Sequence, residues 1–266
     1  MPNQIIITKV VNAISSLRGW PALRILDLSC GEGALLECLH RHGCHVEGTH
    51  YRDDDYILKR PLEILKQVPI HQNVDLTRPL PFEDRQFDVV IATEVMEHLP
   101  NHAAFLVEAT RIITNHGHLI LTTPNIHRVQ SRFQFALTGQ HELRSARLGW
   151  DILPENLYST HHNPVYFPVL HSLLYHNNMR VIRTFFSKCN IFAFLLLPLL
   201  PLIWMATAVE ARHSIKQSRQ GGLNLLRWLI NFNNLFSDKL IVCAKKGEQS
   251  PSPYSSPAAG SESGEA

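Results

Sequence analysis

A short glycine-containing turn follows the first apolar run of the chain. LRILDLS (23–29) continues into CGEG, in which Gly31 and Gly33 precede a helical pattern. Glycines between a strand and a helix let a ligand press against the backbone where a side chain would clash. A dinucleotide fingerprint would place its third glycine at Leu36, so that fingerprint fits poorly. Asp27 ends the run, and its carboxylate would repel a pyrophosphate and attract an amine or a ribose.

Histidines are the other abundant residues that could do chemistry, and the chain has 16 of them. His40, His42 and His45 lie close together in sequence. They span a helix end and a strand start, and they lack an H-E-x-x-H pattern or a cysteine partner at metal-binding spacing. We therefore predict no metal site.

The bulk composition is that of an ordinary enzyme. The 266 residues carry 25 Lys+Arg against 23 Asp+Glu, so no basic field favours nucleic acid. A mean hydropathy of -0.06 excludes a polytopic membrane protein. Five cysteines (30, 38, 44, 189 and 243) form no C-x-x-C pair and are interpreted as reduced thiols in the cytoplasm. The N-terminal sequence does not resemble a signal peptide.

Strand and helix patterns alternate through the first half of the chain. A helix is expected over 4–18, strands over 23–29, 45–50, 87–92 and 118–123, and a third strand ending at 73–76. Helices are expected over 32–42, over 53–67 with a bend at Pro61, and over 101–114. Strands that are apolar on both faces and separated by helices predict a doubly wound α/β fold with a mostly parallel sheet.

The second half loses this rhythm. Residues 126–160 are polar and show no clear period, and a helix (165–175) and a strand (179–186) follow. IFAFLLLPLLPLIWMATAV (191–209) then runs without a charge, before an amphipathic stretch (223–236) and a last strand (239–244). The Ser/Pro/Gly/Glu-rich residues 247–266 are predicted to be disordered.

Three sequence blocks resemble the class I S-adenosylmethionine-dependent methyltransferases, and most of all the small-molecule branch that includes ubiquinone-biosynthesis O-methyltransferases. The blocks are LRILDLSCGEG (23–33), LPFEDRQFDVVIATEVMEHLPN (80–101) and GHLILTTPN (117–125). The resemblance covers 20–125 well and 155–186 loosely. It implies a seven-stranded Rossmann-like sheet and S-adenosylmethionine as the cofactor.

The resemblance also implies positions for the cofactor residues. It places Asp27 and the backbone of Ser29, Gly31 and Gly33 at the methionine moiety, and Asp75 and Leu76 at the adenine. Thr93 and Glu94 would line the adenosine and the opening for methyl transfer. His50 stands where the family has an acidic residue that grips both ribose hydroxyls, and the first loop glycine is Ser29 here.

These departures leave two alternatives open. Neutral histidine cannot accept two hydrogen bonds from a ribose, and one of Asp53, Asp54 and Asp55 would then substitute for the acidic residue. The simpler interpretation of the three aspartates is a helix start, where negative charge is favourable. A degenerate, non-catalytic member of the family also stays open.

Candidate catalytic residues follow from the same resemblance. His98 recurs in the family and faces the acceptor region, and His161 and His162 lie where relatives close over the acceptor. The alternatives are a structural hydrogen bond for His98 and surface loop positions for the other two. NPVY (163–166) matches a signature of DNA amino-methyltransferases but does not follow the fourth strand, and it reads as a turn before a helix. We therefore exclude DNA as the substrate.

The apolar segment 191–209 is long enough, at roughly 28 Å of helix, to match a bilayer core. The last strand must return to the same sheet, and basic residues flank the segment on both sides, so both ends favour the cytoplasmic face. Pro198 and Pro201 would kink the helix. We predict a monotopic or re-entrant anchor within 187–237, paired with 223–236 at the membrane interface. A buried cap over the acceptor pocket, or a dimer face, is the alternative.

The sequence therefore predicts a methyltransferase domain over 1–246 with a disordered tail. The predicted function is methyl transfer from S-adenosylmethionine to oxygen of an apolar or lipid-linked acceptor, at the cytoplasmic face of the membrane. A methyltransferase of a soluble small metabolite and a non-catalytic, membrane-tethered scaffold of the same fold are the alternatives.

Overall fold

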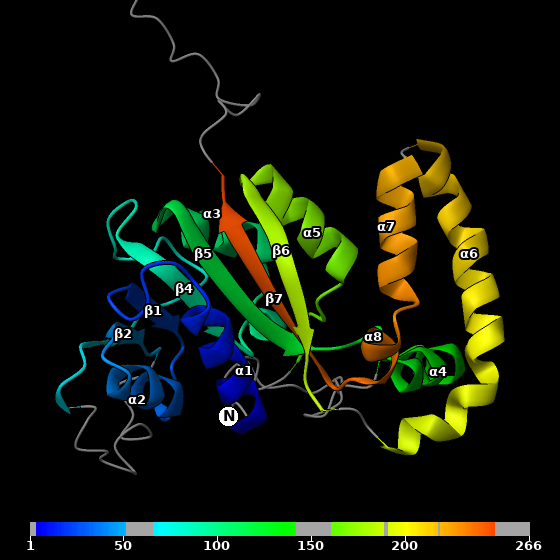
Figure 1. Cartoon of the computed structure of the whole chain (residues 1–266), viewed down its shortest axis with the longest axis horizontal. Helices are drawn as coiled ribbons and strands as arrows, with labels where there is room; N and C mark the ends of the chain where they lie inside the picture. Colours follow the sequence, from blue (N-terminus) through cyan, green and yellow to red (C-terminus); the bar gives the residue numbers. More distant parts are fainter. Residues whose placement is uncertain (1–3, 52–65, 142–160, 189–190, 218, 248–266) are drawn as a thin grey trace, which may run out of the picture.

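The computed structural model describes residues 4–51, 66–141, 161–188, 191–217 and 219–247 (Figure 1). The strands are β1 (Arg24–Leu28), β2 (His45–Thr49), β3 (Ile70–His71), β4 (Phe87–Thr93), β5 (Ile113–Pro124), β6 (Met179–Phe186) and β7 (Lys239–Lys246). The helices before the apolar segment are α1 (Gln4–Ser15), α2 (Ala34–Arg41), the 3₁₀ helix η2 (Met96–His98), α3 (His102–Arg111), α4 (Val129–Thr138) and α5 (Phe167–His176). From the apolar segment onward they are the 3₁₀ helix η4 (Ile191–Leu199), α6 (Leu200–Gln217), α7 (Arg219–Leu229) and α8 (Phe232–Phe236).

All seven strands form one sheet in the order β3-β2-β1-β4-β5-β7-β6. The five strands from β3 to β5 pair in parallel. β7 lies antiparallel between β5 and β6. The predicted doubly wound, mostly parallel, seven-stranded fold is confirmed, and the carboxyl ends of β1, β2, β4 and β5 meet at one edge of the sheet.

Both faces of the sheet are covered, because successive strand residues point to opposite sides. On β1, Ile25 belongs to the core that α1 and α2 cover. Leu26, the next residue, belongs to the core that α3 and α5 cover. The apolar residues of β4 and β5 divide between the two cores in the same way. This double burial is why the strands are apolar on both faces.

Two predictions about the elements were wrong. Residues 73–76 do not end the third strand, which is Ile70–His71. Asn73 has a left-handed backbone (φ 58°), which breaks the extended conformation and starts a loop. The polar stretch after β5 contains the helix α4, which the sequence pattern did not reveal.

Several predictions fall outside the described residues. The helix over 53–67 and its bend at Pro61 lie mostly in 52–65, and Asp53, Asp54 and Asp55 lie there too. The predicted disordered tail lies outside them as well, apart from Gly247.

The apolar segment is divided at its prolines. Pro198 lies within η4, and Pro201 lies in the first turn of α6, where a proline is tolerated because the N–H would be unsatisfied anyway. Figure 1 shows α6 and α7 as a helical hairpin beside the sheet. Among the described residues, no helix combines the length and the apolarity needed to cross a membrane.

The hairpin is attached to the segment that follows β5. The side-chain amide of Asn125 donates to the backbone oxygens of Asn234 (2.6 Å) and Ser237 (3.0 Å). Arg128 forms a buried ion pair with Asp238. These partners lie in α8 and just before β7, at the end of the segment 187–237 that separates β6 from β7 (the insert). The end of the insert is therefore fixed to the edge of the sheet where β5 ends.

Candidate active site

The turn after β1 has a positive φ at three positions. Ser29, Gly31 and Gly33 have φ values of 65°, 55° and 77°. The Ser29 N–H donates to the Thr49 hydroxyl of β2 (2.9 Å), which ties the turn to the neighbouring strand. Ser29 therefore holds a backbone conformation that favours glycine, at the position where the resemblance places the family's first loop glycine.

Asp27 lies under this turn and is almost fully buried, with 2% of its surface exposed. Its Oδ1 accepts no hydrogen bond from the described residues. Burial raises the pKa of the Asp27 carboxyl to about 8, because a charged carboxylate loses its hydration here. A buried acceptor of this kind suits a ligand that brings its own positive charge or hydrogen-bond donors.

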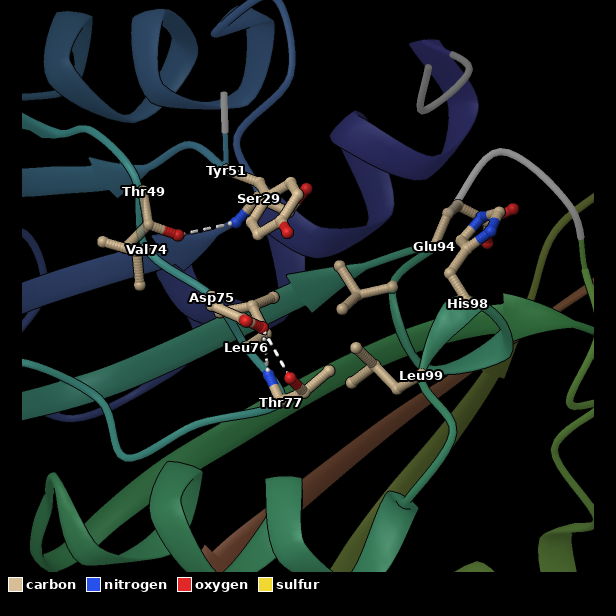
Figure 2. A pocket seen from close by; sticks show the side chains of 11 residues that line it. Ser29, Thr49, Tyr51, Val74, Asp75, Leu76, Thr77, Glu94, His98 and Leu99 are labelled. Carbon is tan, nitrogen blue, oxygen red and sulfur yellow. Dashed lines mark hydrogen bonds between the residues drawn. The ribbon is translucent and has the colours of Figure 1, made fainter. Parts of the chain in front are cut away.

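A cavity of about 120 Å³ opens beside the turn, at the carboxyl ends of the strands (Figure 2). Figure 2 shows Glu94 and His98 across the cavity from Thr49 and Tyr51. The described residues that line it are Ser29, Thr49, Tyr51, Val74, Asp75, Leu76, Thr77, Glu94, Val95, His98 and Leu99.

The cavity brings together only some of the predicted cofactor residues. Ser29, Asp75, Leu76 and Glu94 line it, as does the catalytic candidate His98. Its lining does not include Asp27, Gly31, Gly33, His50 or Thr93. Asp27 lies in β1 directly before the adjoining turn, and the two glycines lie in that turn. His50 lies between the lining residues Thr49 and Tyr51 in the sequence. Tyr51 and Thr77 line the cavity without having been singled out in the sequence.

Asp75 is held rigidly in the loop after β3. Its Oδ1 accepts from the N–H (2.9 Å) and the hydroxyl (2.7 Å) of Thr77, as the dashed lines in Figure 2 show. Its Oδ2 lies 3.3 Å from Nε of Arg78. This Asx turn positions the carboxylate for recognition and limits its rotation.

Glu94 follows β4 directly and is the most heavily constrained residue of the cavity. Its backbone is left-handed (φ 57°), and its N–H donates to the backbone oxygen of Thr122 (3.0 Å). Its Oε1 accepts from the Thr122 hydroxyl (3.1 Å), and its Oε2 forms an ion pair with Lys239. Lys239 begins β7, so the strand after the insert supplies a side chain to this edge of the cavity.

Lys239 was not identified from the sequence. Burial lowers the pKa of its ammonium group to about 8, and the carboxylate of Glu94 stabilises the charged form. The signal that could have found it is its position at the amino end of an antiparallel strand, because that end lies beside the carboxyl ends of β4 and β5.

A second group of polar residues lies next to the cavity. The rings of His98 and His161 are 4.7 Å apart between centroids, and His161 Nε2 lies 3.9 Å from Oε1 of Glu97. The Asn163 N–H donates to the backbone oxygen of Glu97 (3.1 Å), which holds the 161–163 segment over η2. The structure thus brings the predicted residues His98 and His161 together, with Glu97 as an additional member.

Burial keeps this group close to neutral. It raises the pKa of Glu97 to about 7, against the opposing effect of hydrogen bonds. It also lowers the pKa of His161 to about 4, and the neighbouring His98 adds to that shift. At neutral pH His161 therefore has an uncharged imidazole with a lone pair that can accept a proton or bind a metal ion.

The geometry departs from the prediction that the chain has no metal site. One ligand atom from each of Glu97, His98 and His161 lies within 4.8 Å of the others, so the three could hold a divalent cation. His40, His42 and His45, which lie close together in sequence, do not form such a group among the described residues. His162, the remaining catalytic candidate, is half-buried next to His161.

A comparison with protein families adds independent support. Residues 26–121 match the model described as "Methyltransferase domain". The matched stretch holds the β1 turn, the cavity residues and the strands up to β5. The comparison therefore identifies residues 26–121 as a methyltransferase domain.

Curated relatives match about half of the chain. A ubiquinone biosynthesis O-methyltransferase from Maricaulis maris is 31% identical over 149 residues, which is 56% of each chain. Another from Azorhizobium caulinodans is 32% identical over 124 residues, which is 47% of this chain and 48% of the relative. The chain thus spans about half the length of the curated relatives it matches.

Solved structures share the whole fold at low sequence identity. A SAM-dependent methyltransferase from Archaeoglobus fulgidus has a TM-score of 0.56 at 16% identity. The match covers 91% of this chain and 94% of that structure's chain. Magnesium protoporphyrin IX methyltransferase from Synechocystis, solved with bound SAH, has a TM-score of 0.54 at 14% identity, with 91% and 81% covered. At these identities the likeness shows the fold.

The Glu94–Lys239 pair predicts a measurable stability effect. Lys239→Met would leave a mostly buried carboxylate without its cation, and we expect a loss of about 3 kcal/mol in the free energy of unfolding, measured by urea denaturation. Lys245→Met, on the exposed side of the same strand, is the control and should cost little. Adding Glu94→Gln should recover part of the loss, and an additive double variant would contradict the pairing.

Proposed function

We propose that the chain transfers a methyl group from S-adenosylmethionine to oxygen of an apolar, lipid-linked acceptor. The observation that carries the cofactor assignment is the buried Asp27 beneath the left-handed turn Ser29–Gly33. A zwitterionic methionine moiety offers an ammonium group to Asp27 and a carboxylate to backbone N–H groups of the turn. Asp27 would gain the partner that the described residues do not give it.

The remaining cofactor contacts follow from the cavity. Asp75 would accept a hydrogen bond from the adenine amino group, with Leu76 against the ring. His50 would contact the ribose, and Thr93 and Glu94 would border the adenosine and the opening for methyl transfer. These residues come from the ends of β2 and β4 and from the loop after β3, at the edge of the sheet where ligands of open α/β folds bind.

The acceptor chemistry asks for a group that removes a proton. S-adenosylmethionine supplies a methyl group that is already activated on a sulfonium. This chain must align the acceptor oxygen and take the hydroxyl proton as that oxygen gains the methyl group. Neutral His161 is the best candidate for the proton acceptor, with the His98 ring edge-to-face against it and His162 adjacent. A divalent cation held by Glu97, His98 and His161 would instead lower the pKa of a bound hydroxyl.

Two features support a lipid-linked acceptor at a membrane surface. The curated relatives described above are named for ubiquinone biosynthesis. The insert also exposes large apolar side chains on η4 and α6, which are Leu195, Leu202, Trp204, Met205 and Val209. Exposed apolar side chains gathered on one helical element favour an interfacial helix over an ordinary protein surface. We therefore propose monotopic attachment at the cytoplasmic face, with methylation of a soluble metabolite as the alternative function.

The cofactor assignment predicts a pH dependence of binding. The apo pKa of Asp27 is about 8. A bound ammonium group would lower it, so binding releases a proton. Affinity for S-adenosylmethionine should therefore rise as the pH is raised from about 6 to about 7.5, by up to about tenfold per pH unit. Isothermal titration calorimetry of Asp27→Asn should show weaker binding without this slope.

Matched variants test the rest of the cofactor site in the same titration. Asp75→Ala and Gly31→Val should each weaken binding, the latter because valine is strained at a left-handed φ. His50→Asp should tighten binding if His50 faces the ribose. An absence of any binding by the unaltered chain would favour the non-catalytic scaffold and refute the proposal.

The proton acceptor is tested by methyl transfer to a prenylated catechol. His161→Gln should lower kcat by about 100-fold or more, because general-base removal costs that much. His176→Gln, at the exposed end of α5, should leave kcat unchanged. Dialysis against a chelator distinguishes proton removal by His161 from activation of the hydroxyl by a bound cation. Only a cation-dependent enzyme would lose activity and regain it with added Mg²⁺ or Mn²⁺. Unchanged turnover in both His161→Gln and Glu97→Gln would contradict a role for this group.

Membrane attachment is tested by co-sedimentation with phosphatidylcholine/phosphatidylglycerol vesicles. Leu202 and Met205 expose 58% and 62% of their surfaces. Replacing both with serine should weaken vesicle binding by about tenfold or more, because less apolar area enters the interface. Val107→Ser on α3, at a residue 52% exposed, is the matched control. Equal binding by all three proteins, or none, would rule out attachment through α6.

A further inference from the structure

A groove lies between α5, β6 and α7, separate from the cofactor cavity. Its volume is about 500 Å³, which is within the range of small-molecule sites. β6 is the outer strand of the sheet, so the groove lies at the free edge of the sheet, and α7 of the helical hairpin contributes the lining residues Asn224, Leu225 and Trp228. It shares no lining residue with the cofactor cavity.

The inner wall of the groove is flat and apolar. Phe167 of α5 and Trp228 of α7 stack with ring centroids 4.0 Å apart and planes 18° apart. Val181 of β6 and Leu225 of α7 extend this wall and are both half-buried. Aromatic and branched side chains arranged in this way bury the length of an apolar chain or ring without specific polar contacts.

The groove has an exposed polar side and also one buried polar atom, Nε1 of Trp228, which has no hydrogen-bond partner among the described residues. His171, Arg183 and Asn224 are lining residues with exposed side chains. The described lining includes no acidic residue. An apolar chain would therefore lie along the inner wall, and its far end would reach solvent at the rim.

One continuous segment joins the groove to the candidate active site. His161 contacts Glu97 and His98, and two residues later Asn163 donates its side-chain N–H to the backbone oxygen of Leu99 (2.8 Å). The segment then reaches Phe167, whose N–H donates to Nε2 of His127 (3.1 Å). Residues 161–167 are at most about 20 Å long when extended, at roughly 3.3 Å per residue. The groove thus begins within reach of the residues that would meet the acceptor hydroxyl.

We propose that the groove between α5, β6 and α7 binds the apolar chain of the methyl acceptor while the reacting hydroxyl lies at His98 and His161. The assignment rests on the proposed function and adds the location of the tail. It also gives the insert a role in binding the acceptor, because α7 supplies one wall of the groove. A prenyl chain is the probe class, since a branched, partly planar chain matches the stacked aromatic wall.

The binding experiment uses farnesol, a prenyl alcohol without the reacting ring. Farnesol should change the tryptophan fluorescence of the full chain in a saturable titration, and Trp228→Phe should remove most of that change. Leu225→Trp fills the groove and should weaken farnesol binding by about tenfold or more. Arg227→Trp places the same side chain at an exposed position on α7 and should bind farnesol like the unaltered chain.

The outcomes separate this proposal from the proposed function. Absence of saturable farnesol binding, or equal binding by Leu225→Trp and Arg227→Trp, would overturn the groove assignment even if S-adenosylmethionine binds. Failure of S-adenosylmethionine binding alone would overturn the methyltransferase proposal and leave the farnesol result standing. With prenylated catechols, lengthening the chain should lower KM for the unaltered chain and leave KM unchanged for Leu225→Trp. The same chain-length dependence in both proteins would also overturn the assignment.

Discussion

The antiparallel position of β7 between β5 and β6 is the constraint on which the rest of the structure depends. Because β7 must enter the sheet beside the carboxyl end of β5, the chain that leaves β6 must return to that same edge. An insert of any length between β6 and β7 therefore begins and ends at the edge of the sheet that also holds the cavity. The consequence is chemical as well as topological, because the first residue of β7, Lys239, neutralises Glu94 at the end of β4.

The same edge of the sheet holds polar groups that are poorly solvated without a ligand. Asp27 and Glu97 are buried, and both have raised carboxyl pKa values. Burying such groups lowers the stability of the free protein, and a ligand that brings complementary charge or a proton recovers that free energy. Glu94 is the contrast, because Thr122 and Lys239 already satisfy its carboxylate. The unsatisfied side chains therefore indicate where ligands are expected, and the satisfied one helps to fix the shape of the site.

Features that depend on residues close together in the sequence could be predicted from it. The turn at Ser29–Gly33 and the strands before and after it follow local rules of burial and backbone freedom. Contacts between distant residues were not accessible in the same way. Lys239 reaches Glu94 across 145 positions. His161 lies beside Glu97 in a segment that Asn163, two residues later, ties to the Glu97 backbone oxygen. The third strand was misplaced because the left-handed Asn73 ends it earlier than the apolar pattern suggested.

A cofactor bound over the β1 turn would lie between β1, the loop after β3 and the end of β4. Hydrogen–deuterium exchange of the full chain, with and without S-adenosylhomocysteine, measures this placement. We expect slower exchange in peptides that cover 27–33, 73–77 and 93–99 when the ligand is present, with little change in α7. Protection confined to the hairpin, or no protection at a saturating concentration, would show that the cofactor does not bind over the β1 turn.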